Sequence, residues 1–326
     1  MDASLLRNLY TSRGYDEEKI NQANQAVMDF EQALAFSSIS LNEASVADVR
    51  AHVQRLMQQR RNTLEHLLAL ARYFYLINHH EVYVYFTSLL GGMGVIDRIS
   101  ERMRSHLGAS ETEEFFSQLV YPELGTEPRD FPAYTEKLMA RLEAKYPVET
   151  VAFLLAGNNH DIPSEKFIKE REILNRSDTL DDYLRDYNLR EINVLQEHAD
   201  KHIVWFEQVI TQEVVDFVKG NQEIMSAVRD GDKLYTTKIP YDPVNYLRTD
   251  DPLMKRYYAC HCPFAREAIL NKEVSISSNW CYCSGGFAKH PYEVLFNRPL
   301  KVKLLNSALA GDPICRFEID IHDVVS

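Results

Sequence analysis

The chain has 326 residues, of which 45% are hydrophobic and 26% are charged, a composition typical of a folded globular protein. Its 36 basic and 48 acidic residues give a formal net charge of −12, so no general electrostatic attraction to a nucleic-acid backbone is expected. No apolar run approaches the roughly 18 residues that a membrane helix needs, and the first residues, MDASLLRNLY, do not resemble a secretory signal. We therefore expect a cytoplasmic protein that binds neither nucleic acid nor membrane.

A helical pattern occupies residues 15–228 almost throughout. In the segment 46–77 apolar residues recur at spacings of three and four, which predicts one long amphipathic helix. The glycines at positions 91, 92 and 94 are expected to break a helix, because the strand–turn–helix context of a phosphate loop is missing. Further helices are predicted at 111–119, 132–145, 148–155, 164–174, 180–187 and 189–208. A homodimer formed through the long apolar helices is compatible with this pattern.

Beyond residue 230 the pattern changes to short strands mixed with helices. In chain order we predict a strand at 234–240, an extended segment at 256–262, helices at 263–272 and 286–296, and strands at 300–309 and 314–322. The last two strands should pair as a hairpin around the turn at residues 310–313. The expected fold is α+β: a mostly α-helical region at 1–230, followed by a smaller α+β ligand-binding domain at 231–326 with an antiparallel sheet.

The strongest functional signal is the grouping of cysteines. Four of the five cysteines form two Cys-x-Cys pairs, Cys260 with Cys262 and Cys281 with Cys283. In a reducing cytosol such groups more often serve metal binding, catalysis or redox chemistry than structural bridges. Residues i and i+2 of an extended chain point to the same face, so each pair can present both sulfurs on one side. We predict that the two pairs face one another in one site.

Three chemistries fit this group of sulfurs. All four thiolates could ligate zinc, although Cys-x-Cys is tighter than the usual ligand separation, and an iron–sulfur cluster fits the ligand count without the usual spacing. Alternatively, Cys262 caps the predicted helix at 263–272 and acts as an activated nucleophile, with His261 or His290 as acid or base. The plainer interpretation is that the cysteines are small apolar side chains in the core.

Both predicted helix starts near the cysteines are expected to favour negative charge. Arg266 lies one turn into the first helix, and Gly285 with Gly286 would let backbone N–H groups approach an anion at the second. We predict that these groups hold a substrate carboxylate. Cys315 alternates with apolar residues on a strand and is expected in the core, and His160 is expected to be an ordinary polar loop residue.

Several C-terminal motifs resemble a known group of proteins. They are C-x-C-P-F at 260–264, W-C-x-C-S-G-G-F at 280–287, N-R-P-L at 297–300 and G-D-P-x-C-R-F at 311–317. Together they resemble the L-2-amino-thiazoline-4-carboxylate hydrolase family and the wider 4-vinyl reductase-like small-molecule-binding domains. The likeness is confined to the C-terminal third of the chain.

This resemblance implies an α+β domain with a ligand pocket between its sheet and its helices. The hydrolase branch would open a small ring containing sulfur and nitrogen, and the sensor branch would bind aromatic ligands, in some members beside a cysteine-ligated zinc. Cysteines of those sensors correspond to Ser307 and Ala310 here, so that zinc site does not carry over intact, although Cys315 remains.

The preferred hypothesis is a hydrolase that cleaves a C–N bond of a small cyclic substrate at a thiolate-lined site, with or without zinc. The alternative is a non-enzymatic, zinc-containing small-molecule sensor or binding protein whose helical region passes ligand occupancy to a partner. A structural zinc domain on a helical scaffold is a third reading.

Overall fold

The computed structural model describes residues 1–325, which form two compact units. The N-terminal unit comprises Met1–Gly91 and Pro122–Pro128, and the C-terminal unit comprises Gly92–Tyr121 and the chain from Arg129 onward. The α+β class is confirmed, with most helices in the first part of the chain and antiparallel strands in the last part. None of the helices within residues 1–325 combines the length and apolar character needed to cross a membrane.

The division into units differs from the boundary expected near residue 230. Helices between residues 95 and 219 belong to the same unit as the C-terminal sheet, so the α+β part of the molecule is larger than the sequence suggested. This matters for the site, because helical segments outside the cysteine-rich region can contribute side chains to it.

The N-terminal unit consists of short amphipathic helices. They are α1 (Ala3–Ser12), α2 (Glu17–Ala35), α3 (Val46–Gln58), α4 (Leu64–Leu76) and α5 (His80–Leu90), with a 3-10 turn at Leu41–Glu43. The single long helix predicted at 46–77 is wrong. The chain turns at Arg60, whose φ of 55° is left-handed, and the side chain of Thr63 then caps α4 by accepting the N–H of His66.

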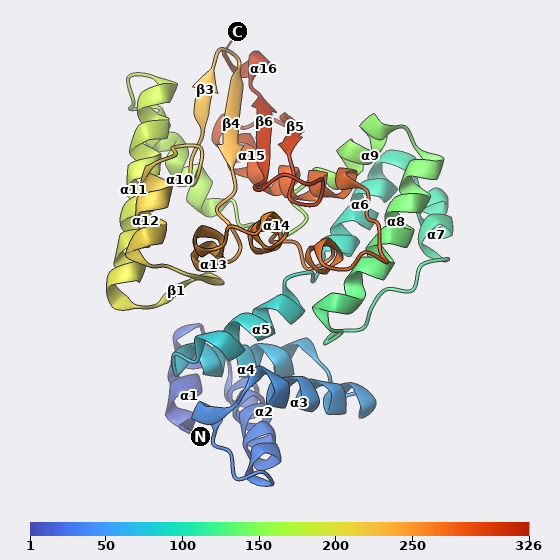
Figure 1. Cartoon of the computed structure of the whole chain (residues 1–326), viewed down its shortest axis with the longest axis vertical. Coiled ribbons are helices and arrows are strands. Elements are labelled where there is room, and N and C mark those ends of the chain that lie inside the picture. The colour runs from blue at the N-terminus through green and yellow to red at the C-terminus, as the bar shows by residue number, and fades with distance from the viewer. Residues whose placement is uncertain (326) are drawn as a thin grey trace. The chain divides into compact units, whose positions relative to one another are not determined.

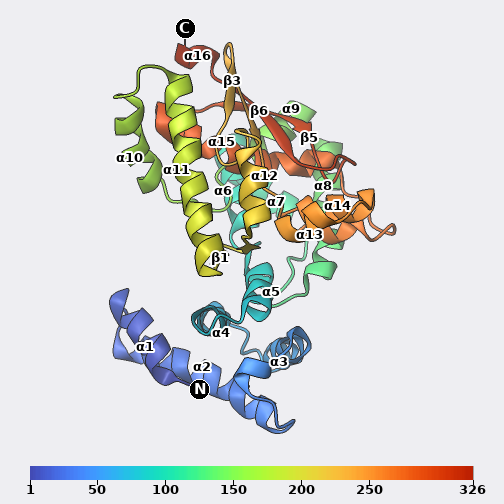
Figure 2. The same ribbon diagram turned by 60° about the vertical axis from the view of Figure 1, so that its left-hand side comes forward.

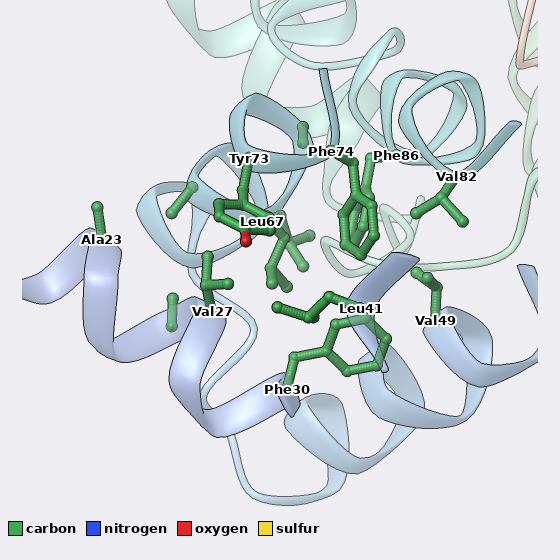
Figure 3. Packing of buried hydrophobic residues seen from close by; sticks show 14 of the residues in the cluster. Ala23, Val27, Phe30, Leu41, Val49, Leu67, Tyr73, Phe74, Val82 and Phe86 are labelled. Atoms are coloured by element: carbon green, nitrogen blue, oxygen red, sulfur yellow. The ribbon is translucent and has the colours of Figure 1, made fainter. Parts of the chain in front are cut away.

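A separate hydrophobic core holds the N-terminal unit together. Phe30, Phe74 and Phe86 are among its fully buried side chains, and the rings of Phe74 and Phe86 stack with centroids 6.1 Å apart (Figure 3). Leu41 and Leu67 fill the space between these rings and the helices that surround them. Each large buried apolar side chain contributes about 1.5–3 kcal/mol of burial free energy, so this cluster is the main stabilising feature of the unit.

The helices of the C-terminal unit largely follow the predicted segments. They begin with α6 (Val95–Leu107), α7 (Ala109–Phe116), α8 (Phe131–Lys145), α9 (Val148–Leu155), α10 (Glu165–Leu174), α11 (Leu180–Lys201) and α12 (Gln212–Lys219). The expected break at the glycines is confirmed, since α5 ends before Gly91 and Gly94 has a φ of 72° in front of α6. The predicted segments at 180–187 and 189–208 are one helix, followed by a hairpin of β1 (Val204–Trp205) and β2 (Gln208–Val209).

The main sheet has four antiparallel strands in the order β3 (Val228–Asp230), β4 (Lys233–Thr237), β6 (Arg316–Asp320) and β5 (Lys301–Asn306) (Figure 1). Phe317 and Ile319 alternate along β6 toward the core and are fully buried. The predicted strand at 234–240 is confirmed in type, although it ends at Thr237, and the C-terminal hairpin is confirmed in type and pairing. Both views in Figures 1 and 2 show α10 and α11 side by side near this sheet.

The cysteine-rich connection between β4 and β5 differs most from expectation. It contains α13 (Pro243–Arg248), α14 (Pro252–Ala259), 3-10 turns at Arg266–Ile269 and Ser278–Cys281, and α15 (Tyr282–Phe296); the short helix α16 (His322–Val325) ends the chain. The extended segment predicted at 256–262 is wrong, because Asp251 caps a helix that starts at Pro252 and runs to Ala259. The helix predicted at 263–272 is reduced to a 3-10 turn.

Helix α15 starts four residues earlier than predicted. Cys281 stands at its N-cap and Cys283 is its second residue, so this pair lies at a helix start and not on a strand. Pro291 is accommodated inside the helix. Cys260 has an extended backbone directly after α14, but Cys260 and Cys262 do not lie on a strand of a sheet. Neither cysteine pair therefore lies on a strand.

Candidate functional site

All five sulfurs nevertheless lie in one region of the C-terminal unit. The cysteines are reduced, and all except the partly exposed Cys262 are buried. Burial raises the pKa of Cys281 well above its usual value, and neighbouring Cys315, Cys260 and Cys262 would raise it further if ionised. An ionised Cys283 would likewise raise the pKa of Cys262. One ionised sulfur affects the pKa of another in this way only when the two sulfurs are close together.

Four of the sulfurs are enclosed by the core. Cys283 is 4% exposed, and the other three, Cys260, Cys281 and Cys315, are each less than a tenth exposed. Ser307 Oγ donates to Cys281 Sγ at 3.0 Å, and the N–H of Ala308 donates to Cys315 Sγ at 3.5 Å. Burial raises the pKa of the Cys260, Cys281 and Cys315 thiols, which keeps them neutral at physiological pH. These residues have the features of a cysteine core.

The arrangement does not match a ready metal site. Among residues 1–325 no group of three or more Cys, His, Asp or Glu side chains is placed to hold a metal ion. Four of the five sulfurs instead accept hydrogen bonds, from Ser307 Oγ, the Ala308 N–H, Trp280 Nε1 and Asn159 Nδ2. The set predicted to ligate zinc or an iron–sulfur cluster, Cys260, Cys262, Cys281 and Cys283, thus does not fit a bound metal in this conformation.

Cys262, the predicted nucleophile, lies against Trp280. The indole Nε1 donates to its sulfur at 3.1 Å, but burial still raises the pKa of the Cys262 thiol to about 12. The two predicted proton carriers interact elsewhere. His261 Nε2 lies 2.6 Å from the carbonyl oxygen of Ile239, and His290 Nε2 lies 3.2 Å from that of Ile162. Among the hydrogen bonds of the described residues, none joins either imidazole to a cysteine sulfur.

Cys283 has a different set of neighbours. Its sulfur accepts a hydrogen bond from Asn159 Nδ2 at 3.4 Å and lies 3.9 Å from His160 Nε2. Both partners come from the loop after α9, more than 120 residues away in the sequence. A cysteine at a helix start, beside an imidazole and an amide donor, is the arrangement expected of an activatable thiol.

The electrostatics of this Cys283–His160 pair define its resting state. Burial raises the pKa of Cys283, while the Asn159 amide, Lys238 and Arg102 act in the opposite direction. Removal of water from around the ring, together with the Lys238 charge, lowers the pKa of His160 to about 4. The pair therefore rests as a neutral thiol beside a neutral imidazole. The ring nitrogen is free of a proton as a general base requires, but both pKa shifts oppose proton transfer in the resting protein.

Gly286 allows the loop after α9 to approach α15, whereas Gly285 packs elsewhere. A Cβ on Gly286 would lie 2.2 Å from the carbonyl oxygen of Gly157, so only glycine permits this approach of α15 to the loop. Gly285 faces the sheet, where a Cβ would lie 3.2 Å from Val302 Cγ1. Both glycines are buried within the helix, so the structure gives the predicted anion-binding pair a packing role.

Two cations accompany the thiols. Lys238 follows β4, and its Nζ lies 4.7 Å from the centre of the partly exposed Phe287 ring. Its charge lowers the pKa of three thiols and of two histidines, which places it centrally in the site. Within the described part of the chain no carboxylate forms an ion pair with it. No sequence pattern pointed to Lys238, because its importance depends on what packs around it.

Arg266, the predicted carboxylate-binding residue, is almost completely buried. Its guanidinium lies 4.1 Å from the ring centre of Tyr241 and 5.5 Å from that of Tyr257. Its Nε is 3.6 Å from Glu267 Oε1, and no acceptor in the described residues forms a hydrogen bond with that nitrogen. A buried donor without an acceptor is unfavourable, so a ligand oxygen would be stabilised here.

A comparison with known protein families matches some of the residues that form this site, but not all of them. Residues 214–326 match the model of a family of unknown function (DUF6144). No curated protein matches the chain, and no solved structure matches it either. The matched segment contains all five cysteines, Lys238 and Arg266, whereas Asn159 and His160 precede it. The site therefore combines the matched segment with helical parts of the same unit.

Proposed function

We propose that this protein is a hydrolase that cleaves a C–N bond of a small cyclic molecule, with Cys283 as the nucleophile and His160 as its proton partner. The observation that carries the proposal is the position of Cys283 Sγ at the start of α15, between Asn159 Nδ2 at 3.4 Å and His160 Nε2 at 3.9 Å. Cys283 with His160 is the preferred reactive pair, in place of the expected Cys262 with either His261 or His290. Among the hydrogen bonds of the described residues, none joins His261 or His290 to a sulfur.

The reaction would proceed in two balanced stages. In the first, the Cys283 proton passes to His160 as Sγ bonds to the electrophilic carbon; the C–N bond then breaks and His160 returns the proton to the leaving nitrogen. In the second, water adds to the same carbon, the C–S bond breaks, and a water proton returns to the sulfur through His160. The Asn159 amide favours the developing thiolate in the first stage. The contact with His160 is long for a hydrogen bond, as is common before substrate binds.

A carboxylate on the substrate would complement the surrounding charge. The charge of Lys238 acts on the Cys283 thiol and that of Arg266 on the Cys260 thiol. Lys238 forms no ion pair with a carboxylate among the described residues, and Arg266 has only the 3.6 Å contact between its Nε and Glu267 Oε1. The resemblance of the cysteine-rich motifs to the L-2-amino-thiazoline-4-carboxylate hydrolase family favours a substrate of this kind. Phe287, partly exposed beside Lys238 and His160, supplies an apolar ring against which a small cyclic molecule can pack.

The test compares two cysteine variants on the same substrates. Purified protein is assayed with small cyclic carboxylates that contain a C–N bond, beginning with 2-amino-thiazoline-4-carboxylate, and the products are identified by mass spectrometry. We expect Cys283→Ser to abolish turnover and His160→Gln to reduce kcat about 100-fold or more. Cys262→Ser should retain most of the activity. Full loss in Cys262→Ser with activity kept in Cys283→Ser would refute this assignment.

A second function, non-enzymatic binding of a small molecule, is favoured by one observation. Burial raises the pKa of all five thiols, so no cysteine is a thiolate at neutral pH before a ligand arrives. A binding protein would take up the same carboxylates without product, and Cys283→Ser would bind them as tightly as the wild type in calorimetry. Because the sulfurs do not form a metal ligand set here, we propose this alternative without zinc.

A further inference from the structure

Arg102, on α6, contacts the loop that carries Asn159 and His160. Its Nη1 donates to Asn159 Oδ1 and to the carbonyl oxygen of Leu154, both at 2.9 Å. Asn159 in turn uses its Nδ2 as a donor to the carbonyl oxygen of Leu155 at 2.6 Å and to Cys283 Sγ at 3.4 Å. The side-chain oxygen and the side-chain nitrogen of this buried amide therefore both have hydrogen-bond partners.

We infer that Arg102 is a positioning residue for Cys283, acting through Asn159. A carboxamide can be turned by 180° with little change in shape, and only its partners decide which end is the donor. Because Arg102 can only donate, it requires the Asn159 oxygen on its own side. The NH₂ group is then directed at the sulfur. This inference rests on the proposed role of Cys283 and adds a residue that never touches the reacting atoms.

The surrounding backbone is shaped to admit the guanidinium. A Cβ on Gly157 would lie 1.4 Å from Arg102 Nη2 and 1.8 Å from its Cζ, so the guanidinium lies directly on the glycine backbone. On the other side of the same residue, Gly286 of α15 packs against the Gly157 carbonyl. Arg102 and Gly286 thus both pack closely against Gly157. Asn159 comes from the same loop as Gly157, and Cys283 comes from the same helix as Gly286.

A direct effect of the Arg102 charge on Cys283 is the competing explanation. The Arg102 charge also lowers the pKa of the Cys283 thiol through space. The two explanations differ in what happens when Asn159 is absent. A relay through the amide loses its effect, whereas a direct charge effect persists.

A double-mutant cycle separates these explanations. The rate of Cys283 alkylation by iodoacetamide at pH 7 is measured on the full chain by peptide mass spectrometry for Arg102→Met, Asn159→Ala and the double variant. We expect each single change to slow the reaction about tenfold, the equivalent of one charge-assisted hydrogen bond, and the double variant to be no slower than Asn159→Ala. Arg102→Lys should recover part of the rate. A double variant slowed about 100-fold, or an unchanged Arg102→Met, would overturn the relay.

Matched variants keep the test valid if Arg102→Met disturbs folding. Arg104→Met, on the same helix, removes a surface ion pair with Glu113 and should leave the rate unchanged. Asn159→Asp keeps the shape of the side chain and the partner of Arg102 but removes the NH₂ donor. It should slow alkylation at least as much as Asn159→Ala, and an unaltered rate would contradict the relay.

A measurement that needs no reagent access distinguishes failure of the relay from failure of the proposed function. If the wild-type Cys283 does not react while folded, its nucleophilic role fails. The relay is then judged from the side-chain amide signal of Asn159 in ¹⁵N NMR. We expect slow hydrogen exchange of this NH₂ group in the wild type and in Arg104→Met, and fast exchange in Arg102→Met. Equal protection in all three proteins would overturn the relay.

Discussion

His52 is a buried polar side chain of the N-terminal unit. It is 4% exposed, and neither of its ring nitrogens has a hydrogen-bond partner in the described residues. Its ring lies 4.7 Å from Phe30 and 5.9 Å from His66, whose Nε2 also lacks a partner. A buried nitrogen without a partner destabilises by about 1–3 kcal/mol, so this position is held by the packing around it.

The pH dependence of stability should follow from this environment. Burial, then the charges of His66 and Arg55, lower the pKa of His52 to about 4, and Arg61 acts the same way; Asp29 opposes them. The folded pKa lies below the unfolded one, so the contribution to stability is complete above about pH 6.5 and is lost as pH falls toward 4. The shift implies a loss of about 2 kcal/mol between pH 7 and pH 5 from this one group.

The substitution His52→Phe tests whether this imidazole causes the pH dependence of stability. We expect His52→Phe to be at least as stable as the wild type at pH 7, because the ring is already packed against Phe30, and to lose about 2 kcal/mol less on acidification to pH 5. The measurement is urea unfolding at both pH values, followed by a probe in the N-terminal unit. Parallel losses in the two proteins would show that His52 does not carry the effect.

At the residue scale, sequence spacing could find the cysteines but not their partners. Two Cys-x-Cys pairs are local patterns that the sequence alone reveals, and the sulfurs of these pairs lie in one region of the C-terminal unit. His160 and Lys238 carry no such pattern, because they reach Cys283 and the other thiols only through the packing of separate elements. The chemical role of a side chain here depends on neighbours that are distant in sequence.

At the scale of single elements, close contact with the Gly157 backbone restricts position 286, near the start of α15, to glycine. Gly286→Ala would place a methyl group 2.2 Å from the Gly157 carbonyl oxygen, where backbone must move to admit it. We expect a loss of at least 3 kcal/mol in unfolding free energy, because overpacking against backbone is more costly than the helix propensity gained. Cys283 alkylation should also change, since the loop carrying Asn159 is displaced.

The neighbouring glycine is a matched control. Gly285→Ala meets a Val302 methyl group at 3.2 Å, and a side chain can yield by a few tenths of an ångström. Because alanine also gains about 1 kcal/mol of helix propensity over glycine, the net change should lie within about 1 kcal/mol of zero. Chemical denaturation of both variants gives the comparison. Similar unfolding free energies for the two variants would mean that the contact with the Gly157 backbone does not destabilise Gly286→Ala.

Some elements are predicted well from the sequence, whereas α14, whose start signal was not used, is missed. Residues 148–155 are helical as expected, and the hairpin of β5 and β6 forms around its turn. An extended segment is predicted at 256–262, but the cap at Asp251 and the proline after it start a helix that runs to Ala259. The apolar and aromatic content of a short segment is weaker evidence than a helix start signal.

At the scale of the whole molecule, the cores explain why the expected boundary near residue 230 is not a division between units. Phe264 and Trp280 of the cysteine-rich segment pack with Phe131 and Leu138 of α8 in one cluster. Thr135 Oγ1 also donates to the carbonyl oxygen of Phe264 at 2.9 Å within this buried region. The cysteine-rich segment thus cannot bury its apolar side chains without the helices that precede it. Its functional residues depend on the same helices.

Two separate cores should give two separable unfolding transitions. Phe30 belongs to the core of the N-terminal unit and Phe264 to that of the C-terminal unit, and each ring is 1% exposed. We expect Phe30→Ala to lower one calorimetric transition and Phe264→Ala the other, each by the equivalent of about 3–5 kcal/mol. Cys283 alkylation identifies the C-terminal transition, because it should accelerate only in Phe264→Ala. A single transition lowered equally by both substitutions would mean that the two cores unfold as one cooperative unit.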